Sequence, residues 1–349
     1  MMMIEATRGR RSSQRAHDAA HGRPKPRRGY FSTSAPTGGS AAAPAASVGA
    51  QFQFTGLRGK LAQRRSLATF TSWRTGGFGD TVYLPAGRDD LATFVRQLPP
   101  SEPLTPIGLG SNTLVRDGGV RGTVVVLHDP GAALAIADGL IYVDAGVACP
   151  KLARFAALHG CAEAEFLAGV PGTIGGALAM NAGCYGGETW RYVARVEMLQ
   201  RDGRFVVRTP SDYAIGYRSV KRHDGASIDE IFTAAWFRFP SGDAAAARAR
   251  IKELLARRIA TQPLGLPNAG SVFRNPDGDH AARLIESCGL KGHTIGGARV
   301  SEKHANFIVN PSGRATAADI ETLIHYVRDT VRAWTGVELV PEVQIIGEP

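Results

Sequence analysis

Long hydrophobic runs are absent from this 349-residue sequence. No apolar segment approaches the roughly 20 residues that span a bilayer, so no association with a membrane is expected. Cysteine is also scarce, and the four cysteines form no CxxC pair and no metal-binding spacing: Cys149, Cys161, Cys184 and Cys288. This pattern excludes a disulfide scaffold, predicts no metal, and indicates reduced thiols in a reducing compartment. Only Cys184 falls in a segment that could lie near chemistry.

The body of the chain lacks an excess of charge of either sign. The whole sequence has a net charge of +10, but residues 1–65 contain 12 Lys and Arg residues against two acids, which accounts for all of it. Residues 66–349 contain 29 basic and 29 acidic residues. A groove for a nucleic-acid backbone needs clustered positive charge, so no nucleic-acid partner is expected for the body.

Residues 1–65 are rich in Arg, Ser, Ala, Gly and Pro. Such a segment buries too little apolar surface to offset its ordering entropy, so we expect a disordered basic extension without a function here. An organelle transit peptide has the same Arg-rich, acid-poor composition, as does an extension from a wrongly chosen start codon or a nucleic-acid-binding arm. We expect a cytoplasmic protein, with an organelle as the alternative if the extension is a transit peptide.

Hydrophobic periodicity predicts two domains after an ordered start near Leu67. The first, residues 66–241, is expected to contain helices at 88–98 and 150–159 and strands at 81–84, 104–107, 122–128, 140–146, 192–200, 204–209 and 228–239. The second, residues 242–349, is expected to contain helices at 244–260, 279–288 and 317–335 and strands at 306–310 and 338–346, the last strand packing back on the first domain. The last of these helices has an apolar stripe that is expected to be core: Ile320, Leu323, Ile324, Val327, Val331 and Trp334.

Glycine is concentrated in two loops. Seven of the 21 residues from 168 to 188 are glycine, and no charge appears before Glu188. Such a loop running into a short helix is either a backbone cradle for a phosphate or a tight turn packed on a sheet, and composition alone leaves the two interpretations even. The second loop, residues 108–115, follows a predicted strand but is not GxGxxG and precedes no long helix, which disfavours a Rossmann unit.

Nine short motifs, in the same order, resemble those of the UDP-N-acetylenolpyruvoylglucosamine reductase (MurB) family. They cover roughly residues 67–347 and are RTGG at 74–77, GLGSNTLV at 108–115, GVPGTIGG at 169–176, MNAG at 180–183, GYR at 216–218, GSVFRNP at 270–276, LKG at 290–292, HANFIVN at 304–310 and PEV at 341–343. Single glycine motifs are weak signals, but nine ordered matches are specific.

The resemblance implies an α+β fold. An FAD-binding domain of the vanillyl-alcohol oxidase/PCMH type would be followed by a smaller α+β substrate domain. FAD would be the cofactor and NADPH the co-substrate. The matching cofactor-binding positions are Arg74, Gly108, Gly110, Ser111, Asn112, Thr113, Gly169, Pro171, Gly172, Thr173, Gly175, Gly176, Asn181 and Gly183.

The resemblance also implies reduction of the enolpyruvyl group of a nucleotide-sugar substrate, UDP-N-acetylglucosamine enolpyruvate, in peptidoglycan precursor synthesis. Arg218 would meet the negative charge that develops on C2 and its carboxylate, Ser271 would deliver a proton to C2, and Glu342 would orient or polarise this assembly. Substrate contacts are expected from Tyr217, Asn275, Lys291 and His304. A monomer is expected.

The chain departs from the family pattern at Val220, Val340, Cys184 and Arg274, none of which is an expected catalytic position. The short separation of Arg218 and Ser271, 53 positions along the chain, resembles that of the subtype that lacks an extra substrate-covering loop. Two alternatives remain at this stage. One is another FAD-linked oxidoreductase of the same cofactor fold, and the other is a nucleotide- or nucleic-acid-binding protein that uses the basic extension.

Overall fold

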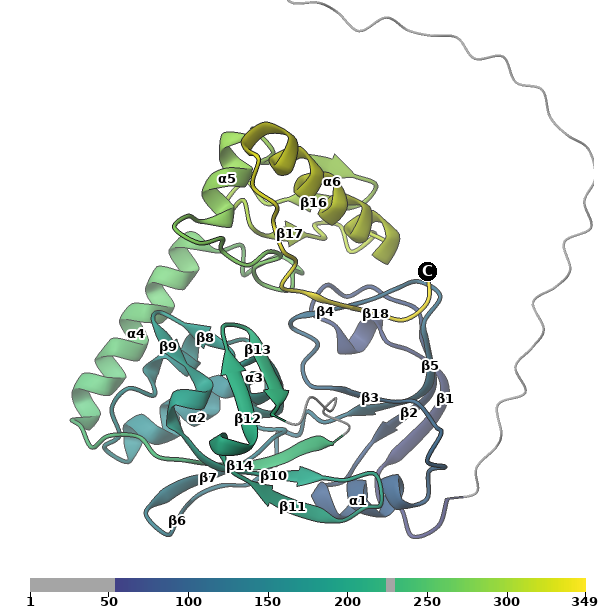
Figure 1. The fold of residues 1–349 in the computed structure, drawn as a ribbon, viewed down its shortest axis with the longest axis vertical. Helices are drawn as coiled ribbons and strands as arrows, with labels where there is room; N and C mark the ends of the chain where they lie inside the picture. The colour runs from purple at the N-terminus through teal and green to yellow at the C-terminus, as the bar shows by residue number, and fades with distance from the viewer. Residues whose placement is uncertain (1–53, 224–229) are drawn as a thin grey trace, which may run out of the picture. The chain divides into compact units, whose positions relative to one another are not determined.

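A computed structural model describes residues 54–223 and 230–349, which belong to one compact unit, Gly49–Pro349 (Figure 1). Most of the predicted extension, residues 1–53, lies outside the described residues, as does the start of the strand predicted at 228–239. Helices and strands are mixed along the described chain, which confirms the α+β prediction. No helix among the described residues is long and apolar enough to cross a membrane.

A four-stranded sheet opens the described chain, in the order β1-β2-β5-β3. Its strands are β1 (Lys60–Ser66), β2 (Phe78–Leu84), β3 (Leu104–Ile107) and β5 (Val120–Val126). β1 pairs antiparallel with β2, whereas β2 and β3 pair parallel with β5. Helix α1 (Arg88–Arg96) buries Leu91, Phe94 and Val95 in a cluster with Tyr83 of β2 and Val125 of β5.

Strand β1 corrects the expectation that residues 1–65 are a disordered extension, because order begins before residue 60. Lys60 pairs with Leu84 and Ser66 pairs with Phe78. The strand is basic, with residues facing solvent along most of its length, and so resembles the preceding residues in composition. Charged residues are common on edge strands, where they prevent pairing with other chains, so composition alone did not separate this strand from the extension.

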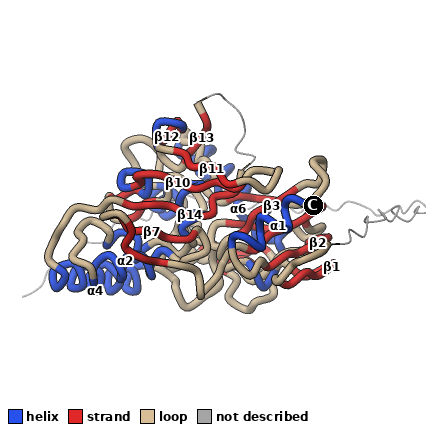
Figure 2. Tube along the Cα trace, turned by 90° about the horizontal axis from the view of Figure 1, so that it is seen from below, coloured by secondary structure: helices blue, strands red, loops and turns tan. Residues whose placement is uncertain are grey.

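A second sheet has five strands, all antiparallel, in the order β11-β10-β14-β7-β6. Figure 2 shows β7, β10, β11 and β14 side by side. The strands are β6 (Leu134–Ala137), β7 (Leu140–Asp144), β10 (Val193–Leu199), β11 (Phe205–Arg208) and β14 (Ile231–Phe237). Helices α2 (Cys149–Leu158) and α3 (Ile174–Met180) share its apolar cluster.

The glycine-rich segment and the segment with the GYR motif each form a short hairpin. β8 (Gly183–Cys184) pairs with β9 (Gly187–Glu188), and β12 (Tyr213–Gly216) pairs with β13 (Ser219–Arg222). The sequence placed the GYR motif between strands. The structure places Tyr217 and Arg218 at the turn of the β12–β13 hairpin, between the paired residues Gly216 and Ser219.

The C-terminal part begins with helix α4 (Ala244–Thr261), whose first turn is capped by the side chain of Asp243. It continues with α5 (Ala281–Ser287), the three-stranded sheet β15 (Thr294–Ile295), β16 (Ala298–Val300) and β17 (Ile308–Val309), and α6 (Ala317–Thr335). Five residues of the stripe on α6, from Ile320 to Val331, are buried as predicted, but Trp334 is 71% exposed. The helical period predicts which residues share a face, not how far along the helix the core extends.

The last strand returns to the first part of the chain. β18 (Gln344–Ile346) pairs in parallel with β4 (Thr113–Val115), which follows the 108–112 glycine loop directly (Figure 1). β18 is shorter than the strand predicted at 338–346. The buried Trp73 indole donates to the carbonyl of Ile308 at 2.8 Å. These contacts bring residues of distant sequence segments together around the two glycine loops.

Candidate functional site

The two glycine loops face one another at close range. A Cβ atom on Gly108 would lie 2.4 Å from Thr173 Oγ1, and a Cβ on Gly172 would lie 3.4 Å from Ser111 Oγ. Gly110 has a φ of +57°, and a Cβ there would lie 2.0 Å from the Phe70 carbonyl oxygen. Side chains at Gly108 and Gly110 would therefore collide with the opposite loop or the backbone.

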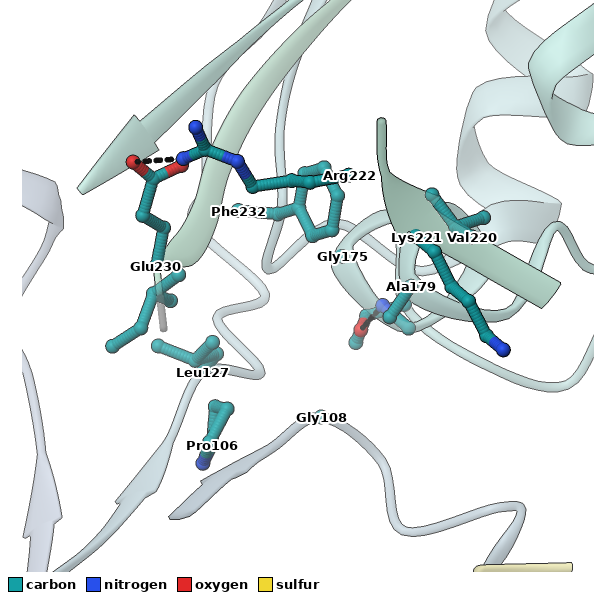
Figure 3. Close-up of a pocket in the computed structure, with 13 residues that line it drawn as sticks. Pro106, Gly108, Leu127, Gly175, Ala179, Val220, Lys221, Arg222, Glu230 and Phe232 are labelled. Atoms are coloured by element: carbon teal, nitrogen blue, oxygen red, sulfur yellow. Dashed lines mark hydrogen bonds and ion pairs between the residues drawn. The ribbon is translucent and has the colours of Figure 1, made fainter. Parts of the chain in front are cut away.

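A cavity of about 630 Å³ opens between these loops. Pro106 and Gly108 lie on one side of it, and Gly175 and Ala179 lie on the other, beside Val220 and Lys221 (Figure 3). Gly176 and Thr173 complete the wall made by the start of α3, and Leu127, Ile231 and Phe232 contribute apolar surface. The cavity thus combines bare backbone with apolar side chains, as ligand sites for flat, partly polar molecules do.

The first amides of α3 have acceptors within the protein, which corrects one part of the phosphate-cradle interpretation. Ile174 N donates to Val147 O at 2.9 Å, Gly175 N to Ala145 O at 2.9 Å, and Gly176 N to the N-cap Thr173 Oγ1 at 3.3 Å. A helix start binds an anion through unpaired amides, and these three are paired. The glycines of α3 therefore serve close approach of the backbone, as the tight-turn interpretation holds, while still lining the cavity.

Asn181 ends α3 in a left-handed conformation, with a φ of 42°. Its side-chain amide donates to Glu188 Oε2 at 3.0 Å and to the carbonyl of Gly216 at 3.1 Å, and its side-chain oxygen accepts from Trp190 N. The buried Asn181 side chain therefore joins β9 to the β12–β13 hairpin. Gly169 is buried too, and a Cβ there would lie 2.7 Å from Cys184 Sγ.

Arg218 and Glu342 form an ion pair. Arg218 Nε lies 2.7 Å from Glu342 Oε1, and the two side chains are 17% and 13% exposed. The guanidinium also donates to the carbonyls of Gly183 at 3.0 Å and Asn181 at 3.5 Å. Two residues of the predicted catalytic set, far apart in sequence, are thereby brought together beside the end of α3.

Burial dominates the electrostatics of Glu342. It raises the pKa of this carboxyl, and the neighbouring guanidiniums of Arg218 and Arg274 oppose the rise without cancelling it. The backbone of Glu342 is fixed from two sides: its carbonyl accepts from Asn112 Nδ2 at 3.1 Å, and its N–H donates to Val272 O at 2.7 Å. Asn112, expected to bind cofactor, therefore uses its side chain to hold Glu342.

The segment that contains Ser271 lies against the segment that contains Glu342. Phe273 bridges Pro341, and Arg274 N donates to the carbonyl of Val340 at 2.9 Å. Asn306 fixes the segment that contains Ser271. Its side-chain oxygen accepts a hydrogen bond from Phe273 N, and its side-chain nitrogen donates one to Phe273 O. Ser271 is thus attached through its neighbours to the strand that supplies Glu342.

The predicted substrate-binding residues have varied surroundings. Lys291 forms an ion pair with Glu286 at 2.7 Å, and burial with the nearby Lys291 charge lowers the pKa of His304. Asn275 accepts a hydrogen bond from Ala281 N at the start of α5. Tyr217 is half-exposed at its hairpin turn, with the Arg218 guanidinium 5.5 Å from the ring centre.

Other predicted cofactor positions, among them Arg74, Thr113, Pro171 and Gly183, are not among the residues that line the cavity. Arg74 is exposed, with a φ of 58°, in the turn that follows Trp73. Pro171 is exposed next to Gly172, and Thr113 begins β4, opposite Gln344. Gly183 supplies a carbonyl to Arg218.

The sequence interpretation missed an ionic cluster on the cavity wall. Glu230, whose side chain is 8% exposed, forms ion pairs with Arg208 and, at 3.5 Å, with Arg222 (Figure 3). The Arg208 bond lowers the pKa of Glu230 despite its burial. Lys221 lines the cavity nearby. Arg208 ends β11, Arg222 ends β13 and Glu230 directly precedes β14. Nothing in these ordinary-looking segments indicates that the three side chains meet, and only the folded chain gathers them.

Neither a reactive cysteine nor a metal-binding cluster is found at this site among the described residues. Cys184 is half-buried beside Gly169, and burial raises the pKa of its thiol. All four cysteines are free. Among residues 54–223 and 230–349, no three His, Cys, Asp or Glu side chains are arranged to hold a metal ion.

Comparison with known proteins defines the class first. Residues 80–208 match the model of an FAD-binding domain, which makes the chain an FAD-dependent oxidoreductase with a domain of the PCMH type and a separate C-terminal domain. The cavity fits that cofactor, because bare backbone at Gly108, Gly175 and Gly176 forms part of its wall and leaves room for a ligand between the two loops. Residues 262–346 match the model of the UDP-N-acetylenolpyruvoylglucosamine reductase C-terminal domain.

The chain belongs to the UDP-N-acetylenolpyruvoylglucosamine reductase family. It is 56% identical over 317 residues to the reductase of that name from Nitrosospira multiformis, covering 85% of this chain and 91% of the relative. It is also 56% identical over 292 residues to the one from Methylococcus capsulatus, covering 83% and 94%. The crystal structure of the Thermus caldophilus MurB superposes with a TM-score of 0.69 at 29% identity, covering 83% of this chain and all of that one.

Proposed function

We propose that Arg218, Ser271 and Glu342 perform the chemical step of this reductase, which converts UDP-N-acetylglucosamine enolpyruvate to UDP-N-acetylmuramate with NADPH as reductant in peptidoglycan precursor synthesis. The observation that supports this assignment is the 2.7 Å contact between Arg218 Nε and Glu342 Oε1, two largely buried side chains from distant parts of the sequence. Burying such a pair is costly, and groups with perturbed pKa values cluster at functional sites. The buried position of this pair beside the end of α3 therefore favours a chemical role over a structural one.

FAD supplies the two-electron carrier between NADPH and the substrate. We propose that Gly108, Gly110, Ser111 and Thr113 hold one side of it, and the segment from Gly169 to Gly176 holds the other. Support comes from the close approach of Gly108 to Thr173 and of Gly172 to Ser111, on either side of the cavity. Arg74, Asn112, Asn181 and Gly183 are proposed to hold these loops in place, since Asn112 and Asn181 use their side chains on protein partners.

Arg218 is proposed to bind the substrate carboxylate and the negative charge that builds up beside it. Its guanidinium is fixed in place by Glu342 and by the carbonyls of Asn181 and Gly183. A cation that is already oriented stabilises developing charge without reorganising during the reaction. A planar fork also matches a carboxylate better than a point charge does.

Ser271 is proposed to donate the proton that completes the product. A serine hydroxyl is a weak acid, so it needs a strongly basic acceptor and a neighbour that shares the charge. Glu342 is suited to that neighbouring role because burial raises the pKa of its carboxyl group. The carboxyl group therefore stays protonated up to a higher pH than that of an exposed glutamate. The backbone bond from Glu342 N to Val272 O keeps the two segments adjacent.

Tyr217, Asn275, Lys291 and His304 are proposed to bind the nucleotide-sugar. Lys291 supplies a positive charge for a diphosphate, and His304, whose pKa is lowered, would donate or accept a hydrogen bond in its neutral form. We further propose a monomer in the cytoplasm without a nucleic-acid partner. The balanced charge of residues 66–349 and the four free thiols support this proposal.

The test separates the two halves of the reaction in the absence of oxygen. NADPH should bleach the flavin absorbance of the purified protein, and UDP-N-acetylglucosamine enolpyruvate should restore it. Flavin that stays reduced in the presence of this substrate would refute the proposed reaction.

A further inference from the structure

Arg274 lies where three segments of the site meet, and no role has been assigned to it. Its N–H donates to the carbonyl of Val340, two residues before Glu342, at 2.9 Å. Its Nη2 donates to the carbonyl of Arg218 at 3.4 Å. Arg274 also stands three residues after Ser271 in the same extended segment. One residue thus links the segments of all three proposed catalytic residues, to Glu342 through its backbone and to Arg218 through its side chain.

The Arg218 backbone needs such support. Its φ of 53° is a left-handed conformation, which is unfavourable for a residue with a side chain compared with glycine. The residue stands at a two-residue hairpin turn, between Gly216 and Ser219. The hydrogen bond from Arg274 to the Arg218 carbonyl ties this turn to the segment that contains Ser271.

Arg274 also contributes charge at Glu342. The charged groups that act on the Glu342 carboxyl are Arg218, from the β12–β13 turn, and Arg274, from the loop before α5. Both favour the ionised carboxylate against the effect of burial. The Nε of Arg274 is buried and has no hydrogen-bond partner among the described residues.

We propose that Arg274 is a positioning residue for the substrate half of the reaction: it holds the Arg218 turn against the Glu342 segment and supplies the second positive charge that faces the Glu342 carboxyl. This inference rests on the roles proposed for Arg218 and Glu342. It predicts an effect on the reaction with substrate and not on the reaction with NADPH, because the hydrogen bonds that Arg274 donates among the described residues go to Arg218 and to Val340, in the segment of Glu342.

The experiment compares Arg274→Gln with Arg274→Lys and with the control Arg328→Gln, which removes a charge from α6 that pairs with Asp329. All are measured in the full-length, FAD-loaded protein by anaerobic stopped-flow in two separate half-reactions across a pH series. Arg274→Gln should slow flavin reoxidation by substrate about 10²-fold, as displacement of a catalytic group by about 1 Å does. Flavin reduction by NADPH should stay near the wild-type rate.

The pH dependence of the reoxidation rate distinguishes the proposed positioning role of Arg274 from a simple loss of packing. With one nearby cation removed, the limb of the reoxidation rate that reports the Glu342 carboxyl should move to higher pH in Arg274→Gln. Arg274→Lys keeps the charge, so its limb should stay at the wild-type pH while its rate falls less. Arg328→Gln should match the wild type in both half-reactions.

Several results would overturn the inference: a wild-type reoxidation rate in Arg274→Gln, equal losses in both half-reactions, or a limb that does not move. If Arg274→Gln does not fold with FAD, Arg274→Lys decides, and wild-type reoxidation rate constants in that variant would refute the role. Failure of the proposed function has a different signature, in which Arg218→Lys would also leave reoxidation by substrate unchanged.

Discussion

At the scale of single residues, Arg218 is the group on which the site depends most. It occupies a left-handed turn position, pairs with Glu342, and donates to carbonyls at the end of α3. Arg218→Lys keeps the charge but loses the planar fork. We expect flavin reoxidation by substrate to slow about 10²–10³-fold, as for loss of one oxyanion-type donor, with flavin reduction by NADPH unchanged. Rates within about twofold of wild type would contradict this role.

Glu342 predicts a pH dependence of stability. Its pKa in the folded protein is raised above the ordinary value of 4.5 by burial. In the window from about 4.5 up to the raised value, the folded chain therefore binds more protons than the unfolded chain. The free energy of unfolding must fall as pH rises through that window.

Glu342→Gln removes this titration, so the stability of the wild type relative to Glu342→Gln should decrease as pH rises from about 4.5. Urea unfolding of both proteins over a pH series measures the difference. A difference that is flat or grows with pH would show that burial does not dominate the environment of Glu342.

At the scale of elements, the approach of the two glycine loops makes a specific prediction. A Cβ on Gly108 would lie 2.4 Å from Thr173 Oγ1, whereas a Cβ on Gly265 would meet nothing within 4 Å. Overpacking of this kind costs about 1–3 kcal/mol, enough to weaken binding about tenfold or more. Gly108→Ala should therefore be purified with less FAD per chain than Gly265→Ala. Equal FAD content, by absorbance of the released flavin, would contradict the two-loop site.

The start of α6 is held by a residue from the first part of the chain. Asp117 accepts from Ala317 N at 3.0 Å and from Ala318 N at 2.9 Å, two amides that the helix itself leaves unpaired. Loss of such a cap costs about 0.5–2 kcal/mol. Asp117→Ala should lower the free energy of unfolding by that amount in urea, while the exposed control Asp329→Ala should change it by less than about 0.5 kcal/mol. Equal effects would refute the cap.

The elements show what the sequence could predict. Helix α6 was predicted at its observed bounds because Thr316 and Asp319 form a capping box and Gly336 ends the helix in a left-handed conformation. Strand β1 and the β12–β13 hairpin were not predicted, because one is a charged edge strand and the other is four residues a side. Each is stabilised by its partner strand, β1 by β2 and β12 by β13, and neither has a strong sequence pattern of its own.

The candidate site was predictable only in part. Motif order identified the family and brought forward Arg218, Ser271 and Glu342 without any geometry. It could not show that Asn112 holds Glu342, that Asn181 uses its side chain on Glu188 and Gly216, or that the first amides of α3 are paired. Each of these depends on which segments meet in space, and local sequence patterns do not encode that.

At the scale of the whole molecule, most of the net positive charge belongs to residues that have no part in the proposed function. Residues 1–53 carry eight basic residues against two acids, whereas residues 66–349 are balanced. A chain that begins at Phe54 should keep FAD and both half-reactions at wild-type rates, and any salt-sensitive binding of the full chain to DNA should disappear. Loss of FAD or of either half-reaction in the shortened chain would show that residues 1–53 contribute to the enzyme.

The central claim is that flavin loading and substrate reduction use different residues, the glycine loops for the first and the Arg218, Ser271 and Glu342 group for the second. Anaerobic stopped-flow on Ser271→Ala tests it most directly. The account predicts flavin reduction by NADPH at close to the wild-type rate, followed by reoxidation by UDP-N-acetylglucosamine enolpyruvate slowed by a factor of about 10² or more. Reoxidation at the wild-type rate, or an equal loss in both half-reactions, would contradict it.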